Sequence, residues 1–312
     1  MGADRQESGP LQINRVTDKE QTVVRNWRFI MNKRVGFTLV ELLVVIAIIA
    51  MLLAILTPSL RRAQGQAKNI VCRSDLKQWA MMFNMYANVN NGRFFQGYGV
   101  GKDGFSTDVW APGEMWMTKL RPYYGGKSGA DSGIDKIRLC PKATKFLSTL
   151  PDVWQSTPFT AWGIYGDPGY AIPAYGEKGD YGSYGINEWI LNRPSLNNNP
   201  SMDAEYWRSI ANLRCPPRTV PLFGDSVWEG TSPKDADVPS SKAGCSGAGL
   251  RDGMWVFCIP RHGLAVNWVF LDLSVQKVSI QDLWNLKWST NFRTGARVSW
   301  TGAPWINKDW GN

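Results

Sequence analysis

The sequence is poor in histidine and lacks paired cysteine motifs. His262 is the one histidine among 312 residues, which excludes any metal site or catalytic centre that needs two imidazoles. The five cysteines contain no Cys-x-x-Cys pair, so neither a zinc knuckle nor a thioredoxin-type redox site is indicated. No run of five basic residues occurs, and the net charge of +9 is spread along the chain. We therefore expect no direct nucleic-acid binding.

Signatures of common enzyme sites are also missing. No serine has a glycine two residues before and two residues after it, so the nucleophile-elbow pattern is absent. The segment 99–104 fits a dinucleotide-binding fingerprint formally, but no clear strand precedes it and no helix follows, so it is interpreted as a loop. His262 with Asp272 and a serine could make a triad, although a structural role for His262 is favoured. We expect no catalytic residues and no enzyme.

One long apolar run stands near the start of the chain. The segment 35–60 carries a single charge, Glu41, and every residue from Leu42 to Leu56 is apolar. About 20 such residues cross the hydrocarbon core of a bilayer. A buried core helix is rarely apolar on all sides, and a cleaved secretory signal has a shorter run that ends in a small-residue cleavage site. The run therefore predicts a membrane-spanning helix.

Glu41 is the unusual residue of this run. An ionised, unpaired carboxylate inside an apolar helix costs several kcal/mol in lipid. The side chain either reaches the lipid headgroups from its place near the helix end or has a functional role.

The residues around Glu41 resemble the N-terminal signature of type IV prepilins and type II secretion pseudopilins. The segment 33–41 reads KRVGFTLVE, a basic leader followed by Gly36 and Phe37, with Glu41 fifth after the cut. Pro58 stands at mature position 22, where that family often has a helix-bending proline. A leader of 36 residues is longer than usual, and a start at Met31 would give a normal one.

The resemblance implies processing, partners and a location. A membrane prepilin peptidase would cleave after Gly36, and the new amine of Phe37 would be methylated. Glu41 and Pro58 would serve assembly with other pilin or pseudopilin subunits, on an inner-membrane platform driven by a cytoplasmic ATPase. The chain would be a single-pass protein of the bacterial inner membrane, with a cytoplasmic N-terminus and an exported C-terminal head.

The predicted fold class is α+β and pilin-like, a long helix packed on a Gly-rich, mainly antiparallel β head. The helix should continue beyond Pro58 as an amphipathic half, because apolar residues recur at three- and four-residue steps from Ala63, Ala67 and Ile70 onward. Leu76, Trp79 and Phe83 should face a core. The sequence Asn90-Asn91-Gly92 should end it. The expected parts are a cleaved leader (1–36), a transmembrane and polymerisation helix (37–60), an amphipathic stem (61–91) and the head (92–312).

The C-terminal region predicts a hairpin. The segments 266–271 and 273–280 read as two strands across Asp272, and a helical turn should follow at 281–288. The block from His262 to Asp272 resembles the His-x9-Asp-Gly signature of a large bacterial group of prepilin-like proteins, with Leu273 in place of the glycine. His262 is expected to tie the hairpin to its lead-in loop.

Three features of the head leave alternatives open. Cys245 and Cys258 are the nearest cysteines and could form a disulfide in an exported domain, or all cysteines could stay reduced. Asp225 is a weak candidate Ca²⁺ ligand, and otherwise no cofactor or metal site is expected. The 16 tryptophans are interpreted as core residues, with an exposed platform for sugars as the alternative.

Two functions fit these features. The main hypothesis is a pilin-like structural subunit of a type II secretion or type IV pilus-like system. The alternative is a membrane-anchored, exported binding module, for example for envelope polysaccharide, that does not polymerise.

Overall fold

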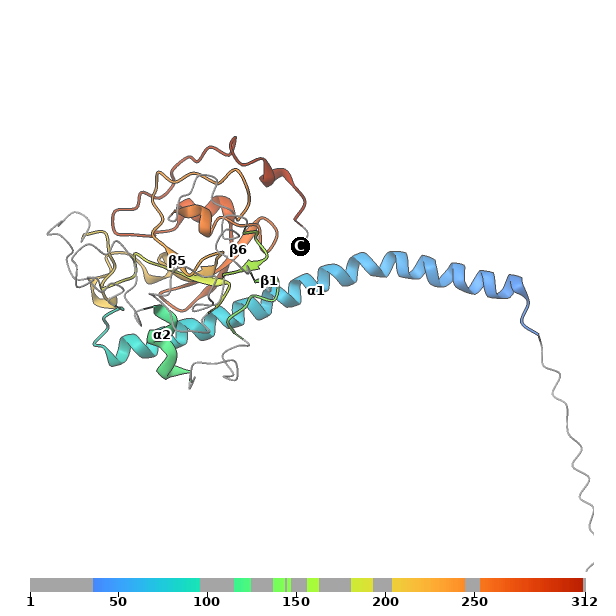
Figure 1. Cartoon of the computed structure of the whole chain (residues 1–312), viewed down its shortest axis with the longest axis horizontal. Helices are drawn as coiled ribbons and strands as arrows, with labels where there is room; N and C mark the ends of the chain where they lie inside the picture. The colour runs from blue at the N-terminus through green and yellow to red at the C-terminus, as the bar shows by residue number, and fades with distance from the viewer. Residues whose placement is uncertain are drawn as a thin grey trace, which may run out of the picture. The chain divides into compact units, whose positions relative to one another are not determined.

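A computed structural model describes residues 36–95, 115–124, 137–143, 145–146, 156–162, 181–192, 204–244 and 253–310 (Figure 1). The chain divides into two compact units between Leu53 and Ala54, inside the first helix. The observed class is α+β: one long helix and a mixed, mostly antiparallel sheet. The class therefore agrees with the prediction, while the predicted part boundaries at 36, 60 and 91 stay predictions.

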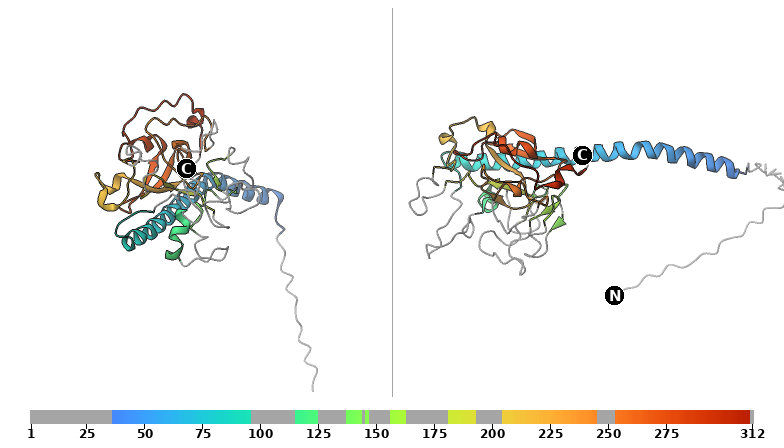
Figure 2. Two further views of the ribbon diagram at one scale, coloured as in Figure 1. Left: turned by 60° about the vertical axis from the view of Figure 1, so that its left-hand side comes forward. Right: turned by 90° about the horizontal axis from the view of Figure 1, so that it is seen from above.

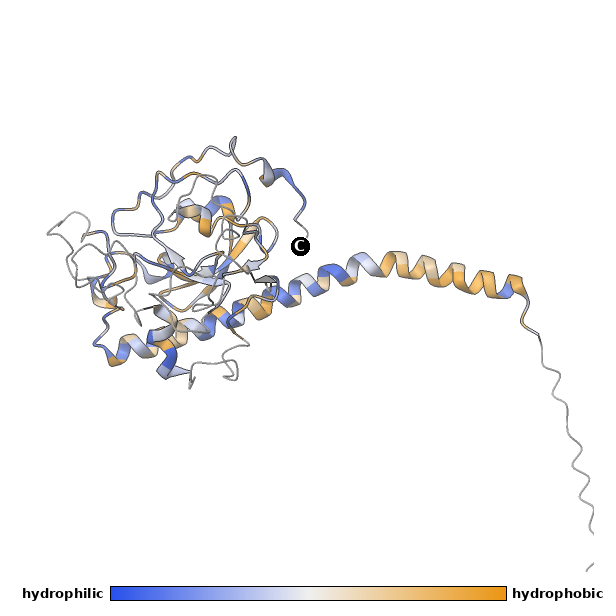
Figure 3. Cartoon of the chain, viewed as in Figure 1, coloured by the Kyte–Doolittle hydropathy of each residue, from blue (hydrophilic) through white to orange (hydrophobic). Residues whose placement is uncertain are grey.

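Helix α1 runs from Leu39 to Val89 and contains 51 residues. Its first part is apolar on all sides, as Figure 3 shows, and its most apolar 18-residue stretch is 0% buried. Among the described residues α1 is the one helix that is long and apolar enough to cross a membrane. The predicted membrane-spanning helix is thus present as a helix.

Pro58 lies inside α1 without ending it. A proline has no backbone N–H, so the carbonyl of Ala54 loses its usual donor four residues on. The Ser59 hydroxyl donates to the carbonyl of Leu56 at 2.7 Å in the same turn. A bend at this proline stays a prediction.

The later part of α1 packs against the head through one face, and Figure 2 shows this half of the helix beside the sheet. The buried positions are Cys72, Asp75, Leu76, Trp79, Ala80, Met82, Phe83 and Ala87. The predicted stripe was wrong in its first part, because Ala63, Ala67 and Ile70 are exposed. The polar segment 61–69 offers only isolated alanines, too little apolar area to hold a packed face.

The helix ends as the sequence predicts. Asn91 and Gly92 adopt positive φ values of 56° and 74°, and the Gly92 N–H donates to the carbonyl of Ala87 at 2.7 Å. Asparagine and glycine tolerate this left-handed conformation better than other residues, which is why the chain turns here.

The main sheet of the head has five strands in the order β5-β3-β4-β6-β7. The β3–β5 pair is parallel, and the other neighbours are antiparallel. A separate parallel pair joins β1 and β2. The strands are β1 Lys145–Phe146, β2 Thr160–Ala161, β3 Tyr184–Asn187, β4 Pro221–Asp225, β5 Gly230–Thr231, β6 Ala265–Phe270 and β7 Val275–Ser279.

Short helical turns lie before, between and after these strands. They are α2 Trp116–Leu120 and the 3₁₀ turns η1 Arg121–Tyr123, η3 Ile210–Asn212, η4 Pro217–Thr219, η5 Met254–Val256, η6 Ile280–Asn285 and η7 Pro304–Asn307. The turn η6 corresponds to the helical turn predicted after the hairpin.

The predicted C-terminal hairpin is present as β6 and β7, paired from Ala265↔Ser279 to Val269↔Val275. In its turn, the Asp272 carboxylate accepts hydrogen bonds from the backbone N–H and the hydroxyl of Ser274. Leu273 has a φ of +65°, a conformation in which a leucine is strained and a glycine is not.

Tryptophans make up much of the core, as interpreted from the sequence. The fully buried ones are Trp79, Trp116, Trp162, Trp207, Trp268, Trp284 and Trp288. Trp268 packs edge-to-face on Phe257 and Trp288 at centroid distances of 4.7 and 4.9 Å. Gly224 lies under Trp268, because a Cβ there would be 2.3 Å from the indole ring. These indoles pack in the core and are not available as a sugar platform.

Candidate functional site

The first candidate site is the chain entering α1. Gly36 and Phe37 precede the helix, and the Phe37 side chain is 67% exposed. A Cβ on Gly36 would meet nothing within 4 Å, and Gly36 has no positive φ. Neither packing nor backbone conformation therefore requires glycine here.

Thr38 and Glu41 form a capping box at the start of α1. The Glu41 Oε2 accepts from the Thr38 N–H and the Thr38 hydroxyl, each at 2.8 Å, and the Thr38 Oγ1 accepts from the Glu41 N–H at 3.2 Å. Two backbone donors that the helix leaves unpaired are satisfied in this way. The Thr-x-x-Glu spacing is the sequence signature of such a box, although Thr38 was not among the expected partners of Glu41.

The side chains that follow offer an apolar surface on every side. Leu39, Ile48 and Ile55 are 78%, 55% and 68% exposed, and their neighbours are similar. Such a helix is unfavourable in water and stable in lipid or between other apolar helices. The segment is therefore built to insert or to assemble.

The second candidate site is a buried polar cluster inside the second unit, composed of Cys72, Cys140, Asp225 and His262. Cys72 comes from α1, Cys140 from the loop 137–143, Asp225 from the end of β4, and His262 from the loop before β6. All four side chains are buried, and their sulfur, oxygen and nitrogen atoms lie within 4.8 Å of one another. The four positions are far apart in the sequence, so no local motif signals them.

Three distances define the cluster. His262 Nε2 lies 3.3 Å from Asp225 Oδ2 and 3.4 Å from Cys140 Sγ. Cys72 Sγ lies 3.5 Å from Asp225 Oδ1. Among the described residues His262 Nδ1 has no hydrogen-bond partner, and the contacts of the ring with Asp225 and Cys140 are made through Nε2.

Arg261 holds the cluster from one side. Its buried guanidinium lies 3.4 Å from Asp225 Oδ1. It also donates to four backbone carbonyls, those of Pro158, Thr160, Ser183 and Ser226. Arg261 thus joins three separate loops around one carboxylate.

The charges in the cluster shift one another's pKa values. Burial raises the pKa of Asp225, but His262 and Arg261 more than offset that and hold it at about 2. Burial lowers the pKa of His262, whereas Asp225 and Cys140 raise it to about 9. Burial raises the pKa of the Cys140 thiol, and hydrogen bonds from Cys72 and His262 bring it down to about 6. The thiol of Cys140 and the imidazole of His262 therefore have one proton between them near neutral pH, which favours a thiolate beside an imidazolium.

The structure separates His262 from Asp272, the two residues of the triad that was considered from the sequence and not favoured. The His262 side chain contacts Asp225 and Cys140, while Asp272 stays within the hairpin turn. A backbone hydrogen bond from the His262 N–H to the Ala265 carbonyl, at 3.0 Å, does join the loop to the start of β6. His262 therefore holds the loop through its backbone N–H and contacts the buried cluster through its ring.

Two further expectations concern a disulfide between Cys245 and Cys258 and a Ca²⁺ ligand at Asp225. Cys258 is buried, and Cys245 lies outside the described residues, so their pairing stays a prediction. Asp225 has sulfur, imidazole and guanidinium neighbours in place of the oxygen-rich shell that Ca²⁺ prefers.

Two cations of α1 hold the hairpin turn. Lys77 Nζ donates to the Leu273 carbonyl at 2.6 Å, and Arg73 Nη2 donates to the Val275 carbonyl at 2.7 Å. The strained Leu273 therefore presents its carbonyl to the helix.

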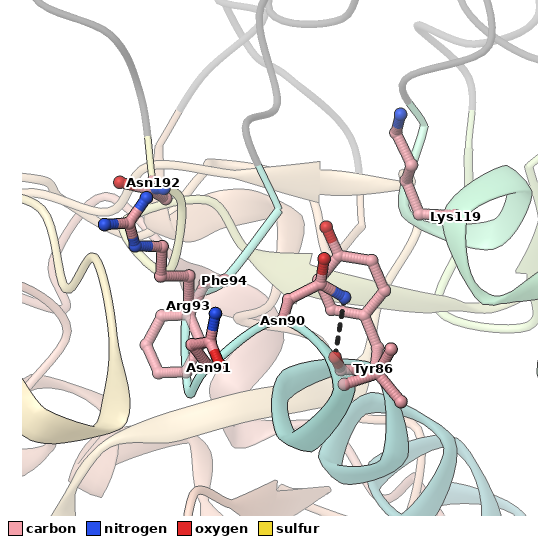
Figure 4. Close-up of a pocket in the computed structure, with 8 residues that line it drawn as sticks. Tyr86, Asn90, Asn91, Arg93, Phe94, Lys119 and Asn192 are labelled. Atoms are coloured by element: carbon pink, nitrogen blue, oxygen red, sulfur yellow. Dashed lines mark hydrogen bonds between the residues drawn. The ribbon is translucent and has the colours of Figure 1, made fainter.

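A third feature is a shallow pocket at the end of α1 (Figure 4). Arg93, Lys119, Asn91 and Asn192 are among the residues that line it. The Asn90 side chain donates to the Tyr86 carbonyl at 2.7 Å beside it. The adjoining segments 96–114 and 193–200 lie outside the described residues, so the pocket indicates no ligand.

Comparisons with known proteins bear on the N-terminal segment. Residues 31–57 match the family model described as the prokaryotic N-terminal methylation motif. Over 56 residues the chain is 46% identical to the type IV wide pilus major component PilA4 of Thermus thermophilus, which is 18% of this chain and 43% of that protein. No solved structure matches the chain. The N-terminal segment is therefore type IV prepilin-like, and the resemblance of the His262–Asp272 block stays a prediction.

Proposed function

We propose that this prepilin-like chain is a pilin-type structural subunit, cleaved after Gly36 and assembled through α1. The observation that carries the proposal is an all-round apolar helix that begins with a capped glutamate directly after an exposed Gly36-Phe37 bond. A tethered enzyme would need the helix only as an anchor and would not need Glu41 within it.

Cleavage would change the surroundings of Glu41. The new amine of Phe37 is cationic, also when methylated, and lies one turn from Glu41. Before assembly, Thr38 already supplies the carboxylate with two hydrogen bonds. In a fibre the amine of an incoming subunit would meet Glu41 of its neighbour in apolar surroundings, where the attraction is stronger than in water. Glu41 would thereby set the axial register of stacked helices.

The later half of α1 supports packing between subunits. Met81, Met85 and Val89 are spaced by four residues and are 43%, 50% and 73% exposed. Residues with this spacing share one helix face. A second apolar stripe, on the side away from the buried face, is thus available for contact with another subunit.

The proposal includes a location and partners. The precursor would wait in the bacterial inner membrane as a single-pass protein, with its N-terminus cytoplasmic and its head exported. Prepilin peptidase would process it, and an assembly platform with a cytoplasmic ATPase would add it to a fibre of pilin or pseudopilin subunits. A type II secretion system and a type IV pilus-like system both satisfy these requirements.

The test compares two substitutions in the capping box. Glu41→Val and the matched control Thr38→Val each break the box, but only the first removes the carboxylate. Both variants are produced with prepilin peptidase and a photo-crosslinking residue at Ile48. Mass spectrometry measures cleavage, and helix-to-helix crosslinks in membranes measure assembly.

We expect both variants to be cleaved and inserted, and only Glu41→Val to lose the crosslinks. Loss in both variants would assign the effect to the helix cap and not to register. Parent-like crosslinking of Glu41→Val would refute the role of Glu41. A parent chain that is processed but never crosslinks would favour the alternative, an anchored binding module.

A further inference from the structure

We propose that the second unit binds one zinc ion through Cys72 Sγ, Cys140 Sγ, Asp225 and His262 Nε2. This site is independent of the proposed assembly function, because its donors all lie after Ala54 and within one compact unit. It needs a single imidazole, which is what the composition allows.

The spacing of the donor atoms fits a tetrahedral ion. With zinc bonds of about 2.0–2.3 Å, neighbouring ligand atoms are separated by about 3.3–3.8 Å. The distances from His262 Nε2 to Asp225 Oδ2 and Cys140 Sγ are 3.3 and 3.4 Å, and Cys72 Sγ lies 3.5 Å from Asp225 Oδ1. These three separations, two of them to different oxygens of Asp225, match those that a zinc ion would impose, and all four donor atoms lie within 4.8 Å of one another.

The types of donor atom in the cluster favour zinc over Ca²⁺ and Mg²⁺. Two thiolates, one imidazole and one carboxylate are the ligands that zinc uses, whereas Ca²⁺ and Mg²⁺ take shells of oxygen. All four ligands are buried, so no coordination position faces solvent. A closed site of four protein ligands is structural and not catalytic.

The charge balance suits a buried ion. Zinc with two thiolates and one carboxylate carries a net charge of −1, and the buried Arg261 guanidinium beside Asp225 compensates it. Binding releases two protons to solvent: that of the Cys72 thiol and the one shared by Cys140 and His262. The complex with Arg261 is then neutral, which a buried site requires.

Neighbouring polar groups hold the ligands in place. Asn267 Nδ2 donates to Cys72 Sγ at 3.2 Å, and the Asn267 N–H donates to Asp225 Oδ2 at 2.7 Å. The Cys140 N–H donates to the Ser183 hydroxyl at 2.7 Å, which fixes its loop. Such outer contacts orient metal ligands and raise affinity.

The site would join four segments that share no local sequence: α1, the loop 137–143, the end of β4 and the loop before β6. Because the ion would be enclosed, it would enter during folding and leave only on unfolding. Zinc would therefore fix the stem helix to the head.

The test uses the full-length chain in detergent, purified without reductant and dialysed against a chelator in the folded state. We expect one zinc per chain by elemental analysis. We also expect that refolding with Co²⁺ gives the thiolate charge-transfer band and the intense visible bands of tetrahedral cobalt. Unfolding in chelator should lower the Tm relative to unfolding with zinc.

Substitutions of single cysteines test where the zinc ion binds. Cys72→Ser and Cys140→Ser should lose the stoichiometric zinc, while the control Cys215→Ser, a thiol outside the cluster, should retain it. If the first two variants fail to fold, the cobalt spectrum of the parent still shows whether thiolates bind the metal ion. A folded parent with neither stoichiometric zinc nor a cobalt–thiolate band would overturn the site, as would a Cys72–Cys140 disulfide found by mass spectrometry. A different stoichiometric metal would overturn the assignment to zinc.

Discussion

Replacing Arg261 by methionine should strongly destabilise the head. The guanidinium is fully buried, and the substitution keeps a long apolar side chain while it removes every donor. The carbonyls of Pro158, Thr160 and Ser226 would lose the hydrogen bonds that Arg261 donates to them.

The size of the effect follows from these contacts. Each buried carbonyl left unpaired costs about 1–3 kcal/mol. Breaking a buried ion pair costs about 3–5 kcal/mol, although His262 and the Asn267 N–H would still partner Asp225. Such costs are not additive, so we expect a loss of at least about 4 kcal/mol, against a total stability of about 5–15 kcal/mol for a typical domain.

The assay is urea unfolding of the full-length chain in detergent, followed by tryptophan fluorescence. Arg261→Lys keeps the charge but loses the planar fork, so it should recover only part of the stability. The control Arg293→Met removes an arginine that is 85% exposed and pairs with Asp235, and should leave the midpoint unchanged. A loss below about 1 kcal/mol for Arg261→Met would refute the reasoning, since even one unpaired buried carbonyl costs that much.

Three further predictions concern other parts of the chain. Gly36→Leu should leave full-length precursor in membranes that contain prepilin peptidase, as judged by mass spectrometry, and normal processing would contradict the role of Gly36. Leu273→Gly should be neutral or raise stability by up to about 1 kcal/mol, because glycine adopts the +65° φ without strain; a clear loss would show that the leucine packing matters more. Burial raises the pKa of Asp75 to about 7, although the hydrogen bond from the Tyr184 hydroxyl opposes this shift. The contribution of Asp75 to the stability of the folded state is therefore largest below its unfolded pKa, and it falls as the pH rises from about 4 to about 7. Asp75→Asn should therefore raise the Tm relative to the parent more at pH 8 than at pH 5, and an equal difference at both pH values would contradict the shift.

Much of the fold could be predicted because its signals are local. The apolar run, the Asn90-Asn91-Gly92 helix end and the alternating strands on either side of Asp272 each depend on neighbouring residues. The first part of the amphipathic stripe was wrong, because Ala63, Ala67 and Ile70 repeat at helical spacing and yet offer too little apolar area to be covered.

The polar cluster could not be predicted in the same way. Cys72, Cys140, Asp225 and His262 come together only after the helix, two loops and a strand have packed. The triad of His262 with Asp272 and a serine was considered from the sequence and not favoured, and the ring contacts Asp225 instead. The capping box of Thr38 and Glu41 is the opposite case, because its Thr-x-x-Glu spacing is a local signal that is visible in the sequence.

The contacts between α1 and the hairpin determine the order in which the head can form. Arg73 and Lys77 bond to carbonyls 202 and 196 residues later in the chain. At about 5–20 residues per second, roughly 10–40 s pass between synthesis of the helix and of its partner. Throughout this interval the helix face lacks part of its cover, such as Phe223 beside Phe83, a situation that favours slow folding and exposure to proteases and chaperones. The last strand to emerge, β7, thus completes these contacts, so the head can finish folding only after Val275 has been synthesised.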